Sequence, residues 1–209
     1  MDFNIITENV KKAFDGFVAN IVAYIIGALI VAIGSCLVIT AAPLMYGLYT
    51  MVLKGTRGEK VEIKDVLYGF SSGSIFIRSW IGLIGLMVVP ICIMIVYVII
   101  SIIIGLVAPT SIALMIMMVL YLLMIIVFLV IGLFLYYTLF IYVMTPSENI
   151  VYAIKESIAI AKANLIMVLL TMLISGILGI FTITIPLGWL FAAYMLKEFK
   201  PDLKDNSGI

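Results

Sequence analysis

Charged residues divide this chain into three long apolar stretches and the short polar segments between them. No Asp, Glu, Lys or Arg occurs in residues 16–53, 79–147 or 163–196, where Ile, Leu, Val, Met, Phe and Ala dominate. A helix of about 20 apolar residues crosses the roughly 30 Å core of a bilayer. Each stretch is long enough for more than one crossing, so the pattern predicts a membrane protein built from helical hairpins.

The first and third stretches each contain a break near the middle. Gly34-Ser35 divides residues 16–53, and the glycine-containing segment 175–179 divides residues 163–196. Each stretch therefore predicts two short crossings joined by a tight turn. Lysines flank both hairpins at both ends: Lys11, Lys12, Lys54, Lys162 and Lys197. The ends of each hairpin then fall on one side of the membrane, which the positive-inside rule identifies as the cytoplasm.

The middle stretch has one strong turn signal, at Ala108-Pro109. Proline disfavours helix in the residue before it and fits the first position of a new helix. Two crossings around this turn give six in the whole chain, with both termini and every charge in the cytoplasm. Three crossings, which the length of residues 79–147 also permits, would leave the basic C-terminal third outside, against the positive-inside rule. We therefore expect six.

An internal repeat is predicted within this single transmembrane domain. Ala19-Asn20 is echoed by Ala163-Asn164, and Pro43 by Pro186, each proline standing eleven residues before a lysine. These matches divide the chain into a first repeat at about 2–55, a central hairpin at about 61–145, a second repeat at about 147–200 and a polar tail at 201–209.

Amphipathic segments open both repeats. Residues 2–17 place apolar side chains at helical spacing opposite charged ones, and Ile150, Ile154 and Ile158 form a similar stripe after Ser147. A weaker stripe occupies residues 61–76. These patterns predict interfacial helices that act as elbows between the crossings.

Composition excludes several classes of function. The 12 basic and 11 acidic residues give a net charge of +1, too little for a nucleic-acid surface. The chain has no histidine, which removes histidine metal sites and Ser-His relays. Its carboxylates all lie at or beyond the ends of the predicted crossings. We expect no catalytic residue, no metal site and no cofactor.

Polar side chains inside the crossings are the candidates for a solute path. The four positions are Asn20, Thr40, Asn164 and Thr182, with Pro43 and Pro186 as expected helix interruptions. Interrupted helices at corresponding places in two halves point to transporter binding sites. No ionisable group accompanies them, however, and Asn and Thr also bond to neighbouring helices in ordinary packing. We expect packing, with a channel or carrier for a neutral or lipid-like solute as the alternative.

A polar turn follows the first hairpin. Arg57-Gly58-Glu59 precedes Asp65-Val66-Leu67-Tyr68-Gly69-Phe70; glycine permits a tight return at the membrane surface, where Arg57 and Glu59 can satisfy one another or lipid headgroups. Together with Pro43 and Gly47, these segments resemble a loosely defined group of uncharacterised prokaryotic six-helix membrane proteins. That group includes the membrane domain attached to some glycerophosphodiester phosphodiesterases. The resemblance implies a six-helix fold, and no enzyme, because no phosphodiesterase domain accompanies it here.

Taken together, these patterns predict an all-α polytopic bundle of six transmembrane helices in three hairpins. We expect a multi-pass protein of the cell membrane with both termini in the cytoplasm and a non-catalytic envelope, scaffold or accessory role. The expected partners are membrane lipids and a second copy or another membrane protein. Nucleic acid is not expected as a partner.

Overall fold

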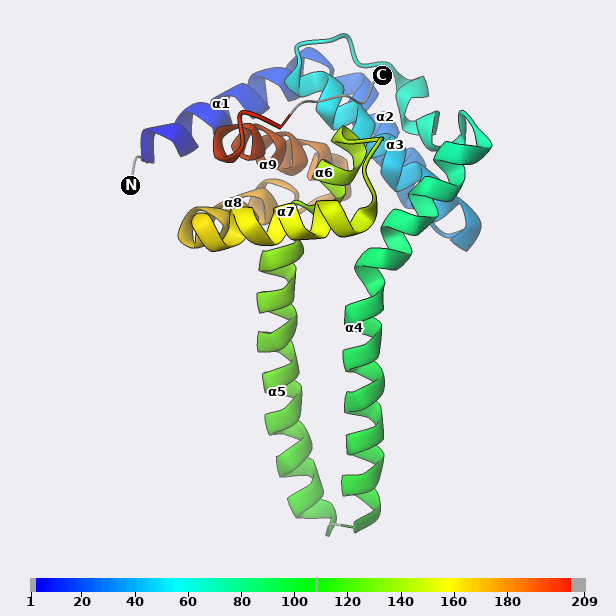
Figure 1. Cartoon of the computed structure of the whole chain (residues 1–209), viewed down its shortest axis with the longest axis vertical. Coiled ribbons are helices and arrows are strands. Elements are labelled where there is room, and N and C mark those ends of the chain that lie inside the picture. Colours follow the sequence, from blue (N-terminus) through cyan, green and yellow to red (C-terminus); the bar gives the residue numbers. More distant parts are fainter. Residues whose placement is uncertain (1–2, 108, 204–209) are drawn as a thin grey trace.

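A helical head and a long projecting hairpin make up the computed structural model, which describes residues 3–107 and 109–203 (Figure 1). The elements in chain order are α1 (Phe3–Ala19), α2 (Ile21–Gly34), α3 (Val38–Thr56), η1 (Ile63–Phe70), α4 (Gly73–Val107), α5 (Thr110–Leu135), α6 (Thr138–Met144), α7 (Ile150–Ala163), α8 (Leu165–Leu178), η2 (Thr182–Thr184) and α9 (Ile185–Phe199). These residues contain no strand. The all-helical prediction is confirmed for the described chain.

The projecting hairpin consists of α4 and α5 (Figure 1). Both helices are long and apolar enough to cross a membrane, and their most apolar windows are entirely unburied. Pro109 forms the N-cap of α5, so the turn lies where the sequence predicts it, although Ala108 is outside the described residues. The middle apolar stretch thus forms two long helices and then the short α6.

Two shorter hairpins, α2–α3 and α8–α9, belong to the head. Their breaks follow Gly34 and Leu178, as the sequence predicts. Each hairpin follows a sharp elbow, since α2 is bent by 87° from α1 and α8 by 107° from α7. The described residues contain two candidate membrane spans, or up to four if each bent pair is counted as one span. The predicted count of six is not confirmed.

Aromatic side chains from three elements form the centre of the head. The Tyr49 ring of α3 stacks on Trp189 of α9 with centroids 4.2 Å apart and meets Phe140 of α6 edge-on at 4.7 Å. Around this centre, α1 packs on α9 and buries Ala13 and Phe17. The apolar stripe of α1 therefore faces protein over most of its length, so α1 is a covering helix of the head.

Contrary to the expectation from the sequence, Pro43 and Pro186 do not interrupt helices. Helix α3 continues through Pro43, its sixth residue, although the proline has no amide hydrogen for the i→i−4 bond at that position. Pro186 lies in the first turn of α9, where a proline replaces an amide that has no helical partner. Neither proline breaks a helix.

Candidate membrane interface

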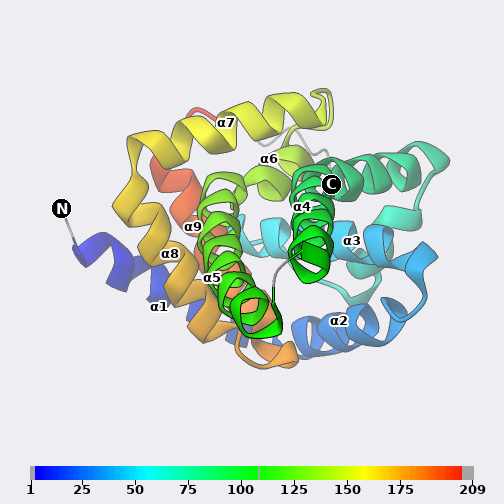
Figure 2. The ribbon, with the colours of Figure 1, turned by 90° about the horizontal axis from the view of Figure 1, so that it is seen from below.

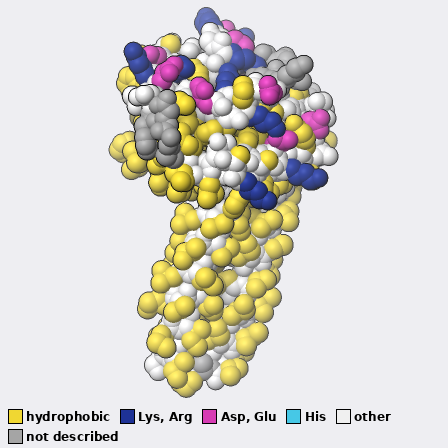
Figure 3. Space-filling view, turned by 60° about the vertical axis from the view of Figure 1, so that its left-hand side comes forward, with side chains coloured by type: hydrophobic (Ala, Val, Ile, Leu, Met, Phe, Trp, Pro, Cys, Tyr) yellow, Lys and Arg dark blue, Asp and Glu magenta, His cyan; other side chains and the backbone are white. Residues whose placement is uncertain are grey.

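Charge separates the head from the hairpin. The described hairpin residues from Ser79 to the end of α5 include no Asp, Glu, Lys, Arg or His, and Figure 3 shows Lys, Arg, Asp and Glu side chains gathered on the head above an apolar shaft. Below Pro90, α4 extends for 17 residues to Val107, which at 1.5 Å per residue is about 26 Å. That length is close to the roughly 30 Å hydrocarbon core of a bilayer.

The head itself carries apolar surface on two hairpins. Seen along the shaft, α2 and α8 lie at the outer edge of the head (Figure 2). Strongly exposed apolar side chains of the head lie on these helices and at or just after the turns that follow them: Val22, Ile33, Leu37, Val38, Ile39, Ile177, Ile180 and Phe181. An apolar surface this extended marks contact with lipid or with another protein.

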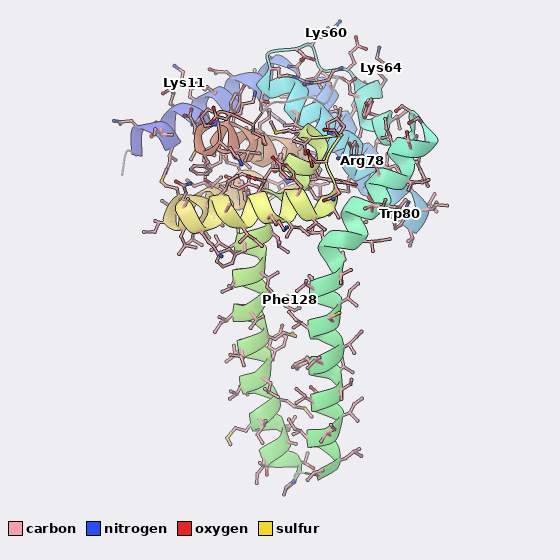
Figure 4. The ribbon with its side chains drawn as sticks, viewed as in Figure 1. Lys11, Lys60, Lys64, Arg78, Trp80 and Phe128 are labelled. Carbon is pink, nitrogen blue, oxygen red and sulfur yellow. The ribbon has the colours of Figure 1, made fainter. Side chains whose placement is uncertain are left out.

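Arg78 fixes the base of the hairpin to the head. From the start of α4 (Figure 4), its guanidinium donates hydrogen bonds to the carbonyl oxygens of Glu148 at 2.9 Å and of Tyr142 and Thr145 at 2.8 Å each. The same group lies 3.9 Å from the centre of the Tyr142 ring, a cation–π contact. One side chain thus joins α4 to the end of α6 and to the segment that leads into α7.

Two glycines bring α3 and η1 into close contact. A Cβ on Gly47 would collide with the backbone of Val66, and a Cβ on Gly69 would collide with the backbone of Pro43. Nearby, the Lys54 ammonium lies 2.9 Å from the Asp65 carboxylate, and both side chains are mostly buried. Close packing between α3 and η1 therefore explains why glycine stands at positions 47 and 69.

Arg57-Gly58-Glu59 forms a turn directly after α3. Helix α3 ends at Thr56, and Gly58 has a φ of 73°, which favours glycine. Arg57 Nε lies 2.6 Å from Glu59 Oε1. Further along, a hydrogen bond from Lys64 lowers the pKa of the exposed Glu62. These charges lie on the head, away from the shaft.

Both predicted asparagines lie at the elbows. Asn20 has φ −127° and ψ 30°, and Asn164 has φ −132° and ψ 37°. Each Nδ2 lies 3.4 Å from the carbonyl oxygen four residues earlier, so each side chain closes the last turn of the preceding helix. Asn20 Oδ1 also accepts a hydrogen bond from Val61 N at 3.2 Å, which ties the first elbow to the segment before η1.

The structure does not bring the four predicted polar positions together. Thr40 donates to the carbonyl oxygens of Gly34 and Leu37 in the α2–α3 turn, while Thr182 is exposed at the start of η2. Asn20 lines a surface groove of about 420 Å³ that includes none of the other three. Two positions therefore form elbows and two lie at turns.

Comparisons with protein-family models, with curated proteins and with solved structures find no match for this chain. The class of the protein thus depends on its own geometry. An all-helical fold, two helices of membrane-spanning length and a charged head define a helical membrane protein. The resemblance to the six-helix group stays a prediction.

Proposed function

We propose that this chain is a non-catalytic scaffold or accessory protein of the cell membrane. In this proposal the α4–α5 hairpin crosses the bilayer and the head lies at the cytoplasmic face. The main support is the placement of the polar residues inside the apolar stretches, since they satisfy local backbone groups at elbows and turns. A carrier would require such residues to face a shared path.

The lengths of the short helices favour two full crossings over six. Helices α2 and α8 have 14 residues each, which corresponds to about 21 Å, less than the hydrocarbon thickness. Their hairpins fit better as re-entrant elements that enter one leaflet and return, with the apolar turns at Leu37 and Phe181 deepest. Six crossings are the alternative, in which the bilayer thins or the hairpins deepen around these helices.

The orientation follows from where the basic residues lie. All of them are outside the apolar stretches, and every hairpin returns to the side from which it starts, whether it crosses or re-enters. The positive-inside rule then assigns the head and both termini to the cytoplasm. This assignment does not depend on the number of crossings.

An internal repeat is supported by the elbows and the prolines. Each repeat has a sharp bend at an asparagine and then a 14-residue helix. From Pro43 to the end of α3 at Thr56 there are thirteen residues, as there are from Pro186 to the end of α9 at Phe199. Both prolines are buried. We propose that the two units arose from one ancestral elbow hairpin.

Labelling with a membrane-impermeant maleimide tests the topology. The native Cys36 lies exposed in the α2–α3 turn, so a Cys92→Ala background reports on that turn alone. In a background without cysteines, Ser111→Cys reports on the shaft tip and Ser72→Cys on the head, and both positions are exposed. We expect Ser111→Cys to react from outside the cell, and Ser72→Cys and Cys36 to be protected. If Cys36 reacted with reagent added outside the cell, the α2–α3 hairpin would cross the membrane, as the six-crossing alternative requires.

Reconstituted vesicles distinguish a scaffold from a carrier. We expect vesicles that contain the purified protein to take up glycerol, and to exchange a fluorescent phospholipid between leaflets, no faster than protein-free vesicles. A protein-dependent rate that Asn20→Leu or Asn164→Leu abolishes would favour the carrier and overturn the scaffold assignment.

A further inference from the structure

An apolar groove lies where the hairpin leaves the head. Its volume is about 380 Å³, within the range of about 300–1,000 Å³ that is usual for small-ligand sites. Helices α4, α5 and α7 line it with Val89, Ile131, Phe134, Leu135, Ile154, Ile158 and Lys162. Six of these side chains are apolar and one is a cation. The groove therefore fits a molecule that has an apolar body and an anionic end.

The charge at the groove has no ion-pair partner among the described residues. Lys162 and Lys155 lie seven residues apart on α7, about two helical turns, so they point to similar sides of the helix. Both are exposed, and neither forms an ion pair in the part of the chain that the structure describes. The one acid of α7, Glu156, is paired with Lys200. Lys162 in the groove lining and Lys155 on the same side of α7 are therefore both uncompensated within the described part of the chain.

The position of the groove matches the boundary of the proposed membrane. Val89 of α4 and Ile131 of α5 lie where the two helices leave the head, and the uncharged shaft continues beyond them. Figure 3 shows basic side chains at the lower margin of the head, beside the shaft. Lysine side chains at such a boundary extend their ammonium groups to the lipid headgroups and leave their stems in the apolar layer.

We propose that this groove binds one anionic phospholipid of the cytoplasmic leaflet, with an acyl chain among the apolar side chains and its phosphate at Lys162 and Lys155. The proposal rests on the proposed crossing of the bilayer by α4 and α5. A lipid bound in the groove would join the shaft to the head, because its acyl chain would contact α4, α5 and α7 together. The lipid would then stabilise the angle between the shaft and α7.

Native mass spectrometry of the detergent-purified full chain tests this site, with dioleoyl phosphatidylglycerol and dioleoyl phosphatidylcholine as probes. We expect the wild-type chain to bind phosphatidylglycerol more tightly. Lys162→Gln should weaken that binding about five-fold, the change that about 1 kcal/mol per cation implies. Lys155→Gln should act in the same direction. The matched control is Lys60→Gln, since Lys60 is exposed at the far end of the head (Figure 4) and should have no effect.

A second variant tests the apolar half of the site. Ile158→Phe adds volume inside the groove, so it should lower the affinity for both probes while the protein elutes as wild type in size-exclusion chromatography. Equal loss of phosphatidylglycerol in Lys162→Gln and Lys60→Gln, or equal affinity for the two lipids, would overturn the proposal. A change in oligomeric state without a change in lipid affinity in Ile158→Phe would instead assign the groove to a second copy.

The two proposals fail in different experiments. Absence of external labelling at Ser111→Cys would remove the crossing hairpin and with it the lipid site. External labelling at Ser111→Cys with no lipid preference in the wild-type chain would remove the lipid site alone.

Discussion

Replacement of Arg78 should loosen the joint between the shaft and the head. In Arg78→Met the three carbonyl oxygens of Tyr142, Thr145 and Glu148 lose their shared donor, and the Tyr142 ring loses its cation. A hydrogen bond from a charged donor contributes about 1.5–3 kcal/mol. The side chain is partly exposed and the three bonds are not additive, so we expect a total loss of about 3 kcal/mol.

The assay is thermal unfolding in detergent, followed by size-exclusion chromatography of heated samples. For a chain of this size about 1 kcal/mol corresponds to 2–4 °C, so Arg78→Met should melt about 6–12 °C lower. Arg78→Lys keeps the charge but lacks the planar fork that reaches several carbonyls, and should lose an intermediate amount. Thiol-reactive dyes would not serve here, because Cys36 and Cys92 are both exposed in the folded chain.

Two controls make the Arg78 result decisive. Lys60→Met removes an exposed cation at the far end of the head and should melt with the wild type. Tyr142→Phe keeps the ring and removes only the hydroxyl group, whose bond to the Arg78 carbonyl oxygen is 3.3 Å long, so the loss should stay below about 1 kcal/mol. If Arg78→Met melted within about a degree of Lys60→Met, the clamp would have no energetic role and the reasoning would be refuted.

Three further predictions use the same melting assay. Gly47→Ala should lower stability by about 1–3 kcal/mol, because the new methyl group meets the backbone of Val66, whereas Gly73→Ala, which meets nothing within 4 Å, should not. Gly58→Ala should lower the free energy of unfolding by about 1 kcal/mol, because Gly58 has a φ of 73° and open space around it. Gly58→Asn should lower it less. Equal stability of the wild type and these two variants would exclude a strained turn. Asn20→Leu should destabilise more than Asn164→Leu, since Asn20 alone of the two also accepts from Val61 N, and the opposite order would contradict this account of the elbows.

Breaks in the helices could be predicted from the sequence because their causes are local. The Gly34-Ser35 turn, the Pro109 turn and the turn at Arg57-Gly58-Glu59 all depend on residues that restrict or free their own backbone. The positions of the elbows could be predicted in part for the same reason. The sequence marks Asn20 and Asn164 as polar residues in apolar stretches. Their role as elbow residues follows only from their backbone angles in the structure.

Contacts between distant elements could not be predicted in this way. In the sequence Arg78 is simply the last charge before a long apolar stretch, yet its hydrogen-bond partners are more than 60 residues away. A lone arginine at the edge of a membrane segment is a usable signal, but it does not name the carbonyl groups that receive its hydrogen bonds. The stripe of α1 shows the same limit, since an amphipathic pattern fits an interface and a protein surface equally well.

Hydropathy counts apolar residues and not uninterrupted helix, so it predicts six crossings where the described residues give two helices of membrane-spanning length, or up to four candidate spans. The first and third apolar stretches are as free of charge as the middle one, but each has an elbow at an asparagine and a turn about 14 residues later. The middle stretch has no such elbow, and α4 continues for 35 residues through Pro90. In this chain the two apolar stretches that have an asparagine elbow form short hairpins, and the stretch without one forms the shaft. In the proposed arrangement each hairpin returns to its own side, so the charged head would keep one orientation whether the chain crosses twice or six times, and the basic residues on α7 would stay beside the same leaflet.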